Sequence, residues 1–419
     1  MTFEDFQESL IDSALQTIQK HEGILKELNH QIWSNPELAY EEHNAHQSIC
    51  DLFEKLNLEG YHISRGVYGL KTAMRIEYRQ GPCPGRRVVA FNAEYDALPE
   101  IGHACGHNLI TTSSVTAFIA TCETMRSFFP EKSKFAVRLL GTPAEEAGGG
   151  KVQMLQQGAY SDVDACLMVH PMPIASGDPH LLSVATGLAG GFLAIDEVRV
   201  TFIGKPAHAT AAPWEGINAL DAVVAAYLNV SLLRQQMLPS QRVHGIIVSG
   251  GDRANIIPMS ATMEYSMRSP TSESLNVLKK KLTDCLEAAA TATGCELELK
   301  WGVGYADLKP NPTICRSYVS ALKAMGHHAV LDGSNIEGVL NGGSTDMGNV
   351  SHAVPGFHAM FAIPTEGVNH TPQFTAGAGS AEAFKRSLAC AAGMAVTACQ
   401  ILVDDTFAAQ VRSDFDSGV

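Results

Sequence analysis

Short apolar runs that alternate with helical segments and end in polar side chains constrain the fold of this chain most. Such runs occur at 87–92, 135–140 and 165–169, and the segments at 109–127 and 151–157 have the spacing of helices. Strands that alternate with helices are typical of an α/β sheet with its functional site at the carboxyl edge. The sequence therefore predicts an α/β fold whose main domain has a mixed, mostly parallel sheet flanked by helices.

This alternation is interrupted near residue 194. Strands are expected at 198–202, 243–248, 260–267 and 296–301, and helices at 218–236 and 271–293. These elements suggest an independent, smaller α+β unit inserted into the main domain. We therefore expect a discontinuous main domain at 1–193 and 307–419 and an inserted α+β lid domain at 194–306. A length of 419 residues also favours two domains.

Composition excludes several classes of protein. The formal net charge is -14 and no basic stripe is present, so a nucleic-acid partner is not expected. The acidic N-terminus lacks the pattern of a secretory signal, and no apolar run looks long enough to cross a bilayer, so no membrane partner is expected. The ten cysteines are widely spread without CxxC pairs, which favours reduced thiols and a cytoplasmic protein.

The segment that follows the run at 87–92 carries an unusual number of side chains that can bind metals. Within it, Cys105 and His107 flank a single glycine, and a loop of this kind lets both side chains point to one centre. Thiolate and imidazole are good ligands for zinc and similar divalent metals. Taken alone, a buried cysteine and a hydrogen-bonded core histidine would be the commoner alternative.

Two further candidates follow the next two apolar runs. Glu145 and Glu146 are adjacent carboxylates in a glycine-rich loop, and they repel each other unless a cation or a proton lies between them. A metal could bind one carboxylate and leave the other as a general base. His170 ends the third run. The alternatives are two solvated loop acids and a core histidine, so these residues do not define a site by themselves.

A series of motifs in a fixed order extends these candidates over nearly the whole chain. They are Asn35-Pro36-Glu37-Leu38, the loop 94–108, the glycine-rich loop 142–150, His170-Pro171, the segments 204–209 and 254–258, the segment 344–348 and His370-Thr371-Pro372. With these motifs the chain resembles metallopeptidase family 20, the aminoacylase and glutamate-carboxypeptidase family. Within it, the chain is most similar to the amidohydrolase branch, which contains auxin-conjugate hydrolases, hippurate hydrolases and a vertebrate dipeptidase-like relative.

The resemblance implies a catalytic main domain with two divalent metal ions, zinc or manganese. The implied metal ligands are Cys105, His107, Glu146, His170 and His370. Cys105 would bridge the metals, because this branch uses a cysteine where other members use a bridging aspartate. Glu145 would be the general base for a metal-bridging water, and Asp96 would orient a ligand. Branch members more often carry aspartate at the position of Glu94, so we assign Glu94 no ligand role.

The resemblance also implies residues that contact the substrate. His208 resembles the family histidine that approaches the scissile carbonyl on domain closure, sometimes from a partner subunit. Asn255 and Arg268 resemble lid residues that contact substrate, and a guanidinium suits a free carboxylate; a turn former and a surface ion-pair residue are the alternatives. Backbone N–H groups near Gly343 and Ser344 could bind the same carboxylate.

Lid domains of this family often pair through a strand edge, which makes a homodimer through the lid domain an expectation by analogy, with residues 245–250 as the first candidate edge. Together these features predict a metal-dependent amidohydrolase that cuts the amide bond of N-acyl amino acids or short dipeptides with a free carboxylate. The main alternative is a catalytically inactive binding or regulatory module, which predicts the loss of a metal ligand or of Glu145. A purely structural zinc protein would need a closed site of four ligands and no spare base.

Overall fold

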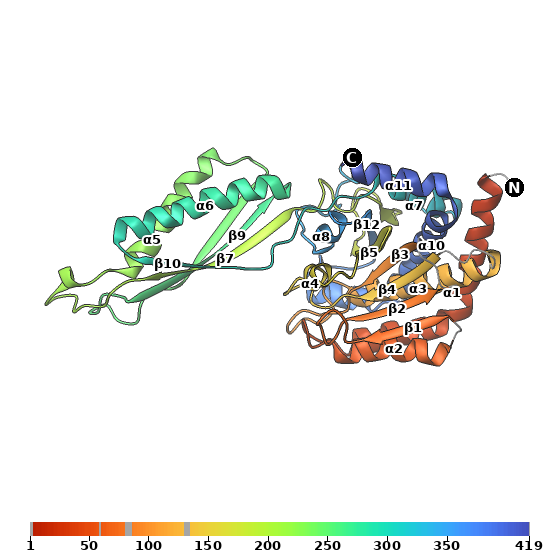
Figure 1. The fold of residues 1–419 in the computed structure, drawn as a ribbon, viewed down its shortest axis with the longest axis horizontal. Helices are drawn as coiled ribbons and strands as arrows, with labels where there is room; N and C mark the ends of the chain where they lie inside the picture. The colour runs from red at the N-terminus through yellow and green to blue at the C-terminus, as the bar shows by residue number, and fades with distance from the viewer. Residues whose placement is uncertain (1–2, 58–59, 80–85, 130–134, 419) are drawn as a thin grey trace. The chain divides into compact units, whose positions relative to one another are not determined.

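The computed structural model describes residues 3–57, 60–79, 86–129 and 135–418, with side chains from residue 7 onward. The chain forms two compact units (Figure 1). The first is Met1–Phe192 with Leu308–Val419, and the second is Leu193–Asp307. These bounds differ by one residue from the boundaries expected for the main and lid domains. A turn expected at 81–85, and the first two residues of the acidic N-terminus, lie outside the described residues.

The first unit is built on one mixed sheet with the strand order β1-β2-β4-β3-β5-β12-β6-β11. Its strands are β1 (Tyr61–Arg65), β2 (Met74–Arg79), β3 (Arg87–Ala93), β4 (Phe135–Gly141), β5 (Ala165–Pro173), β6 (Ser183–Val184), β11 (Ala329–Val330) and β12 (Gly356–Ile363). The central strands β4, β3, β5 and β12 are parallel to one another. The strands β1 and β2 form an antiparallel edge, and β6 runs antiparallel to β12.

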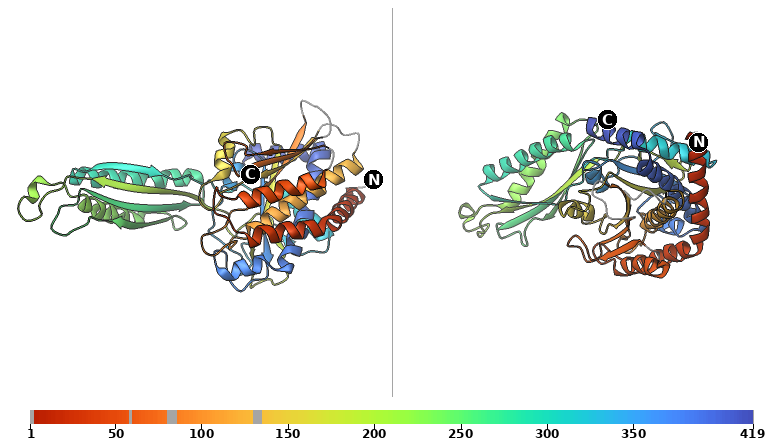
Figure 2. Two further views of the ribbon diagram at one scale, coloured as in Figure 1. Left: turned by 90° about the horizontal axis from the view of Figure 1, so that it is seen from below. Right: turned by 45° about the vertical axis from the view of Figure 1, so that its right-hand side comes forward.

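Both faces of this sheet are buried, which explains why its strands are continuous apolar runs. Val89 and Phe91 of β3 face one hydrophobic core, and Val88 and Ala90 face the other. The first core is covered by helices that lie side by side (Figure 2). These are α1 (Phe3–Ser34), α2 (His43–Leu56), α3 (His107–Phe128), α7 (Pro312–Ala324), α9 (Pro372–Ala378), α10 (Ala381–Val403) and α11 (Asp405–Ser417). The short helices α4 (Gly150–Gln156) and α8 (Met347–Ser351) lie over the second core.

The parallel strands bring distant loops to one edge of the sheet. The strands β3 and β4 end at Ala93 and Gly141, and the segments that follow them carry the candidate ligands. One sequence prediction is wrong here. The strand β5 was expected to end at His170-Pro171 but continues to Pro173, so His170 lies within the strand. Its neighbour in register on β12 is Met360, which keeps His170 in the hydrogen-bonded part of the sheet.

The second unit is an α+β sandwich with its own core. Its antiparallel sheet has the order β10-β7-β9-β8 and is packed on one face by α5 and α6. The elements are β7 (Ala194–Ile203), α5 (Ala219–Leu233), β8 (Arg242–Ser249), β9 (Ser260–Ser269), α6 (Ser272–Thr293) and β10 (Glu296–Trp301). The sequence left Thr271 and Ser272 as alternative caps for α6, and the structure shows Thr271 as the N-cap, because its side chain accepts a hydrogen bond from the N–H of Ser274. The predicted strand at 296–301 is also confirmed.

The helix α10 differs from the expectation that no segment could cross a bilayer. It is long and apolar enough to do so by length and composition alone, but 83% of its most apolar window is buried inside the protein. It packs against α1, α3 and α7 in the first hydrophobic core. A core helix of this kind meets the same criteria as a membrane span, so α10 is weak support for a membrane segment.

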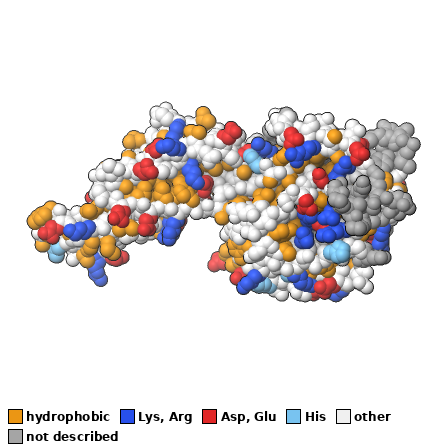
Figure 3. All heavy atoms as spheres, viewed as in Figure 1, with side chains coloured by type: hydrophobic (Ala, Val, Ile, Leu, Met, Phe, Trp, Pro, Cys, Tyr) orange, Lys and Arg blue, Asp and Glu red, His pale blue; other side chains and the backbone are white. Residues whose placement is uncertain are grey.

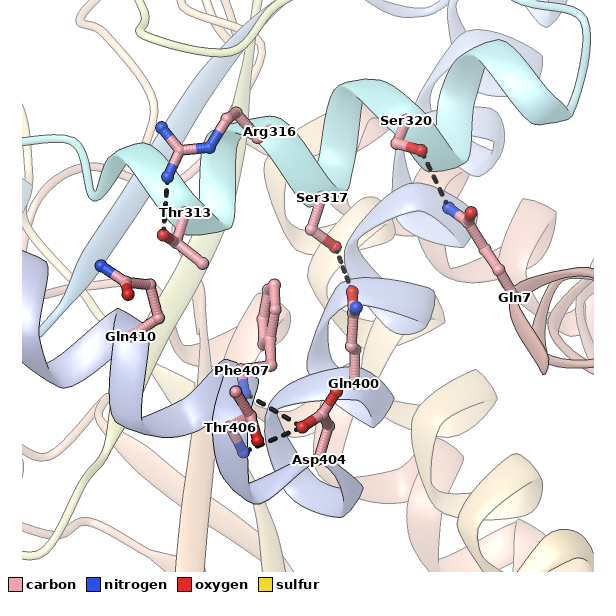
Figure 4. A pocket seen from close by; sticks show the side chains of 10 residues that line it. All are labelled: Gln7, Thr313, Arg316, Ser317, Ser320, Gln400, Asp404, Thr406, Phe407 and Gln410. Carbon is pink, nitrogen blue, oxygen red and sulfur yellow. Dashed lines mark hydrogen bonds between the residues drawn. The ribbon is translucent and has the colours of Figure 1, made fainter. Parts of the chain in front are cut away.

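Polar side chains join α1, α7, α10 and α11 around an open pocket (Figure 4). The hydroxyl of Ser317 donates to Oε1 of Gln400 over 2.7 Å, and the Gln7 amide donates to the Ser320 hydroxyl over 3.2 Å. Asp404 accepts hydrogen bonds from the first backbone N–H groups of α11 and caps that helix. Because these groups bond to one another across the helices, we assign the pocket to helix packing.

A buried ion pair between neighbouring strands of the sheet allows the stability of the first unit to be tested. Arg138 on β4 is only 2% exposed, and it lies 2.7 Å from Glu77 and 2.8 Å from Asp162. Replacing Arg138 with Met leaves Glu77 buried with less compensation, and we expect the free energy of unfolding to fall by about 3 kcal/mol in urea titrations followed by circular dichroism. The control Lys280→Met removes the exposed ion pair with Asp284 and should leave the midpoint unchanged. If Arg138→Met unfolded at the same urea concentration as the wild type, this ion pair would not contribute to stability as expected.

Candidate metal centre

The turn after β3 sets the positions of two candidate ligands. Gly106 lies between Cys105 and His107 with φ of 77°. A Cβ atom at this position would lie 2.5 Å from Cγ of Pro171, so the turn requires glycine for both its backbone angle and its contact with β5. The same turn brings Sγ of Cys105 to 3.2 Å from Nε2 of His170. Cys105 of the loop and His170 of the strand β5 therefore lie side by side.

Asp96 orients two of the candidate ligands. Its Oδ1 accepts a hydrogen bond of 2.9 Å from Nδ1 of His107, and its Oδ2 accepts one of 2.9 Å from the backbone N–H of Glu146. The first bond leaves Nε2 of His107 buried and without a hydrogen-bond partner among the described residues. A carboxylate behind a histidine is the usual arrangement for holding a metal-binding imidazole in one orientation.

The loop after β4 brings Glu146 into the same place. Its Oε1 lies 3.4 Å from Nε2 of His370 and 3.8 Å from Nε2 of His107. Ala144, which precedes the two glutamates, has the unusual φ of 59°, and its N–H donates to the buried carboxylate of Glu42 over 2.9 Å. This buried hydrogen bond stabilises the strained backbone of the loop.

The last two candidate ligands are held by hydrogen bonds to the ligand loop and to their own strand. His370 has a φ of 67°, and its N–H donates to the carbonyl oxygen of Ala104 over 2.9 Å. His170 donates from Nδ1 to the carbonyl oxygen of Pro171 over 2.8 Å, which leaves its Nε2 facing Cys105. The C-terminal loop is therefore tied directly to the residue before Cys105.

The candidate ligands form two sets that have one residue in common. Cys105, His107 and His170 make one set, and Cys105, Glu146 and His370 make the other, with the ligand atoms of each set within 4.8 Å of one another. The residues fit a pair of metal ions, because Nε2 of His107 and Oε1 of Glu146 are buried without hydrogen-bond partners among the described residues. Sulfur, imidazole and carboxylate are also the donors that zinc accepts. The shared position of Cys105 is the one a bridging ligand would occupy.

The electrostatics of the cluster favour a bound cation. Burial, followed by the neighbouring Glu94 and Glu146 carboxylates, raises the pKa of Glu145 well above its usual value. Burial and Glu146 likewise raise the pKa of the Cys105 thiol. Negative groups crowded in a buried space are costly to ionise, and divalent cations among them would remove that cost.

The predicted substrate residues are not members of the sets of candidate ligands. Gly343 and Ser344 are in the loop before α8 of the first unit, and neither belongs to the sets of candidate ligands. His208, Asn255 and Arg268 belong to the second unit. Within that unit the loops of His208 and Asn255 lie together, joined by backbone hydrogen bonds, while Arg268 is on β9. Their contacts with substrate remain predictions.

Sequence reasoning assigned no role to three charged residues that the structure places beside the cluster. Nζ of Lys151 lies 2.5 Å from Oε1 of Glu94 and 2.6 Å from Oδ1 of Asp346, and all three side chains are fully buried. Burial alone would lower the pKa of Lys151, but the two carboxylates hold it well above its usual value, so the amine stays charged. The sequence signal that could have identified Lys151 is its position directly after a run of glycines, at the start of a predicted helix.

Comparison with proteins of known sequence shows similarity to peptidases and amide hydrolases. Residues 194–293 match the peptidase dimerisation domain. The chain is 42% identical over 411 residues to the Xaa-Arg dipeptidase of Mus musculus, which covers 96% of this chain and 91% of that protein. It is 39% identical over 395 residues to the Xaa-Arg dipeptidase of Homo sapiens, with 93% and 88% covered. One component of the p-aminobenzoyl-glutamate hydrolase of Escherichia coli is 29% identical, with 71% and 61% covered.

Solved structures share the fold. A dinuclear metal-binding peptidase of the M20 family from Bacillus subtilis superimposes with a TM-score of 0.65 at 22% identity, covering 90% of this chain and 99% of that one. An aminobenzoyl-glutamate utilization protein from Klebsiella pneumoniae gives a TM-score of 0.62 at 18% identity, with 94% and 98% covered. The homologues and the shared fold indicate a metal-dependent amidohydrolase or dipeptidase. The chain belongs to the M20 family of metallopeptidases, which confirms the family and fold class predicted from the sequence.

The shared position of Cys105 can be tested by metal content. After chelation and reloading with zinc or manganese, the wild-type protein should hold about two ions per chain by mass spectrometry. Cys105→Ala should lose both ions, because both sets include its sulfur, whereas His370→Ala should keep about one. Cys166→Ala, a control that removes a buried thiol outside the sets, should keep about two. Two ions retained by Cys105→Ala would contradict the shared ligand.

Proposed function

We propose that this protein is a dipeptidase that hydrolyses the amide bond of short dipeptides, or of N-acyl amino acids, with a free carboxylate. The observation that carries the proposal is a buried glutamate, Glu145, directly beside two sets of candidate metal ligands that share one cysteine. A structural metal site needs no such additional base. We propose the cytoplasm as the place of action, on composition alone.

The chemistry follows from the positions of the side chains. When bound by Cys105, His107, Glu146, His170 and His370, zinc or manganese ions would polarise the amide carbonyl and lower the pKa of the attacking water. Glu145 takes one proton from that water as its oxygen bonds to the carbonyl carbon. It gives the proton to the amide nitrogen as the carbon–nitrogen bond breaks, so an amine is released together with a carboxylic acid that keeps the second hydrogen of the water. Burial, followed by the neighbouring carboxylates, raises the pKa of Glu145 and so also makes it a stronger proton acceptor.

Two observations favour a dipeptide with a basic C-terminal residue as the preferred substrate. The relatives that are 42% and 39% identical are Xaa-Arg dipeptidases, and the match extends over more than nine tenths of this chain. The net charge of -14 also favours the approach of a cationic substrate. For the free carboxylate we propose the guanidinium of Arg268 and the N–H groups of Gly343 and Ser344, with His208 and Asn255 as further substrate contacts.

We further propose a homodimer formed through the second unit. The match to a peptidase dimerisation domain covers most of this unit. Its edge strand β8 exposes apolar side chains on both faces, with Ile246 at 52%, Ile247 at 45% and Val248 at 43% exposure. Apolar side chains are visible on the surface of this unit among charged ones (Figure 3). An uncovered apolar edge strand pairs readily with another strand, and a second copy supplies an identical one.

The catalytic proposal is tested by Glu145→Gln. The amide keeps the size of the side chain but cannot take a proton, so kcat for an Ala-Arg dipeptide should fall at least about 100-fold while two metal ions are retained. The readout is release of free arginine. Glu366→Gln, which changes an exposed glutamate, is the control and should retain wild-type kcat.

Substrate class is resolved in the same assay. The wild-type enzyme should release arginine from Ala-Arg faster than from N-acetylarginine, and faster than it releases glutamate from Ala-Glu. Full activity of Glu145→Gln would exclude the assigned base. If the metal-loaded wild-type protein cleaved none of these compounds, a catalytically inactive binding module would be the better explanation.

The dimer is tested by placing charges on β8. In the double variant Ile246→Lys/Val248→Lys, two like charges on each edge would face those of the second copy, so the mass from light scattering should fall from a dimer to a monomer. Val277→Lys on α6 removes another exposed apolar side chain of the same unit and should leave the dimer intact. A wild-type monomer at micromolar concentration would exclude this proposal.

A further inference from the structure

A line of three buried charges lies beside the metal centre and is not used by the mechanism above. Asp346 accepts hydrogen bonds from both the backbone N–H and the Nζ of Lys151, over 2.9 and 2.6 Å. Nζ of Lys151 then lies 2.5 Å from Oε1 of Glu94. The line therefore connects the residue that precedes α8, the start of α4 and the loop after β3.

Stability alone does not explain this arrangement. Transferring three charged groups from water into the protein is costly, and well-packed apolar side chains often replace such groups without loss of stability. Two carboxylates and one amine also leave a surplus negative charge in the line. Lys151 donates a hydrogen bond to Oε1 of Glu94 and leaves Oε2 without a hydrogen-bond partner among the described residues. The line of charges therefore ends at this one oxygen atom.

That oxygen faces the catalytic centre. Oε2 of Glu94 is buried and has no hydrogen-bond partner among the described residues, and it lies 3.5 Å from Nε2 of His107. Glu94, His107 and Glu145 form a further set, in which one ligand-type atom from each residue lies within 4.8 Å of the others. A water molecule that donates both hydrogens to carboxylate oxygens holds those oxygens about 4.4 Å apart. The separation of the two glutamates is therefore compatible with one water between them.

We propose that Glu94 is a second catalytic carboxylate, which accepts a hydrogen bond from the attacking water while Glu145 removes the other hydrogen as a proton. This inference rests on the proposed function. The water oxygen forms its bond to the carbonyl carbon, Glu145 carries one proton to the leaving nitrogen, and the hydrogen held by Glu94 stays on the new carboxyl group until product release. Two acceptors direct the lone pair of the water toward the substrate. Lys151 and Asp346 are positioning residues that hold Glu94 in this orientation.

The decisive variant is Glu94→Gln. The amide oxygen can still accept from Lys151, which turns the NH₂ group toward the centre, where it is a donor instead of an acceptor. We expect kcat for Ala-Arg to fall about 10- to 100-fold, with KM within about twofold of wild type. Metal content should remain at about two ions per chain, and the thermal midpoint should not fall. Glu94→Asp keeps the charge but shortens the side chain, so its kcat should lie between those of the wild type and Glu94→Gln.

Glu77→Gln is the matched control, because Glu77 is an equally buried, ion-paired carboxylate outside the centre. It should lower the thermal midpoint and leave kcat unchanged. Wild-type kcat in Glu94→Gln overturns the proposal, and loss of a metal ion in that variant overturns it in favour of a metal-ligand role. If Glu94→Gln fails to fold, wild-type kcat in Glu94→Asp overturns it. These results are separable from failure of the proposed function, in which the wild-type enzyme cleaves no amide or Glu145→Gln stays active.

Discussion

The candidate metal centre depends on the two hydrogen bonds that the carboxylate of Asp96 accepts. One of its oxygens holds the imidazole of His107, and the other holds the backbone of Glu146, so a single buried side chain joins loops that follow two different strands. The parallel sheet supplies the rest of the geometry, because it ends these strands at one edge, next to His170 on β5. A metal centre built in this way is as rigid as the sheet below it.

The candidate metal ligands and the exposed apolar edge strand lie in different units. All candidate ligands, together with the buried glutamates, lie in the first unit, whose two hydrophobic cores enclose the sheet on both faces. The second unit has a separate core and an edge strand with exposed apolar side chains. Metal binding and the proposed self-association could therefore be disturbed independently by substitutions in different units.

Local patterns predicted the elements well, because strands and helices follow from nearby residues: the helix expected at 271–293 and the strand at 296–301 are examples. Most candidate ligands were found from their residue types and their positions after the apolar runs, whereas His370 came from the family resemblance alone. The structure gathers them in one place. The ion pair of Lys151 with Asp346 joins residues 195 positions apart, and no periodicity encodes such a contact. The extension of β5 beyond His170 was missed because Pro171 suggested a strand end, whereas pairing with β12 continues through it.

The shared sulfur of Cys105 also has a thermodynamic consequence. Burial raises the pKa of this thiol, so an empty centre holds it protonated, and the first ion to arrive must displace that proton. A second ion would then meet a thiolate that is already formed and oriented. The two sites are therefore linked, and their affinities would show positive cooperativity. At limiting metal, such a protein population divides into fully loaded and empty molecules, with few that carry one ion.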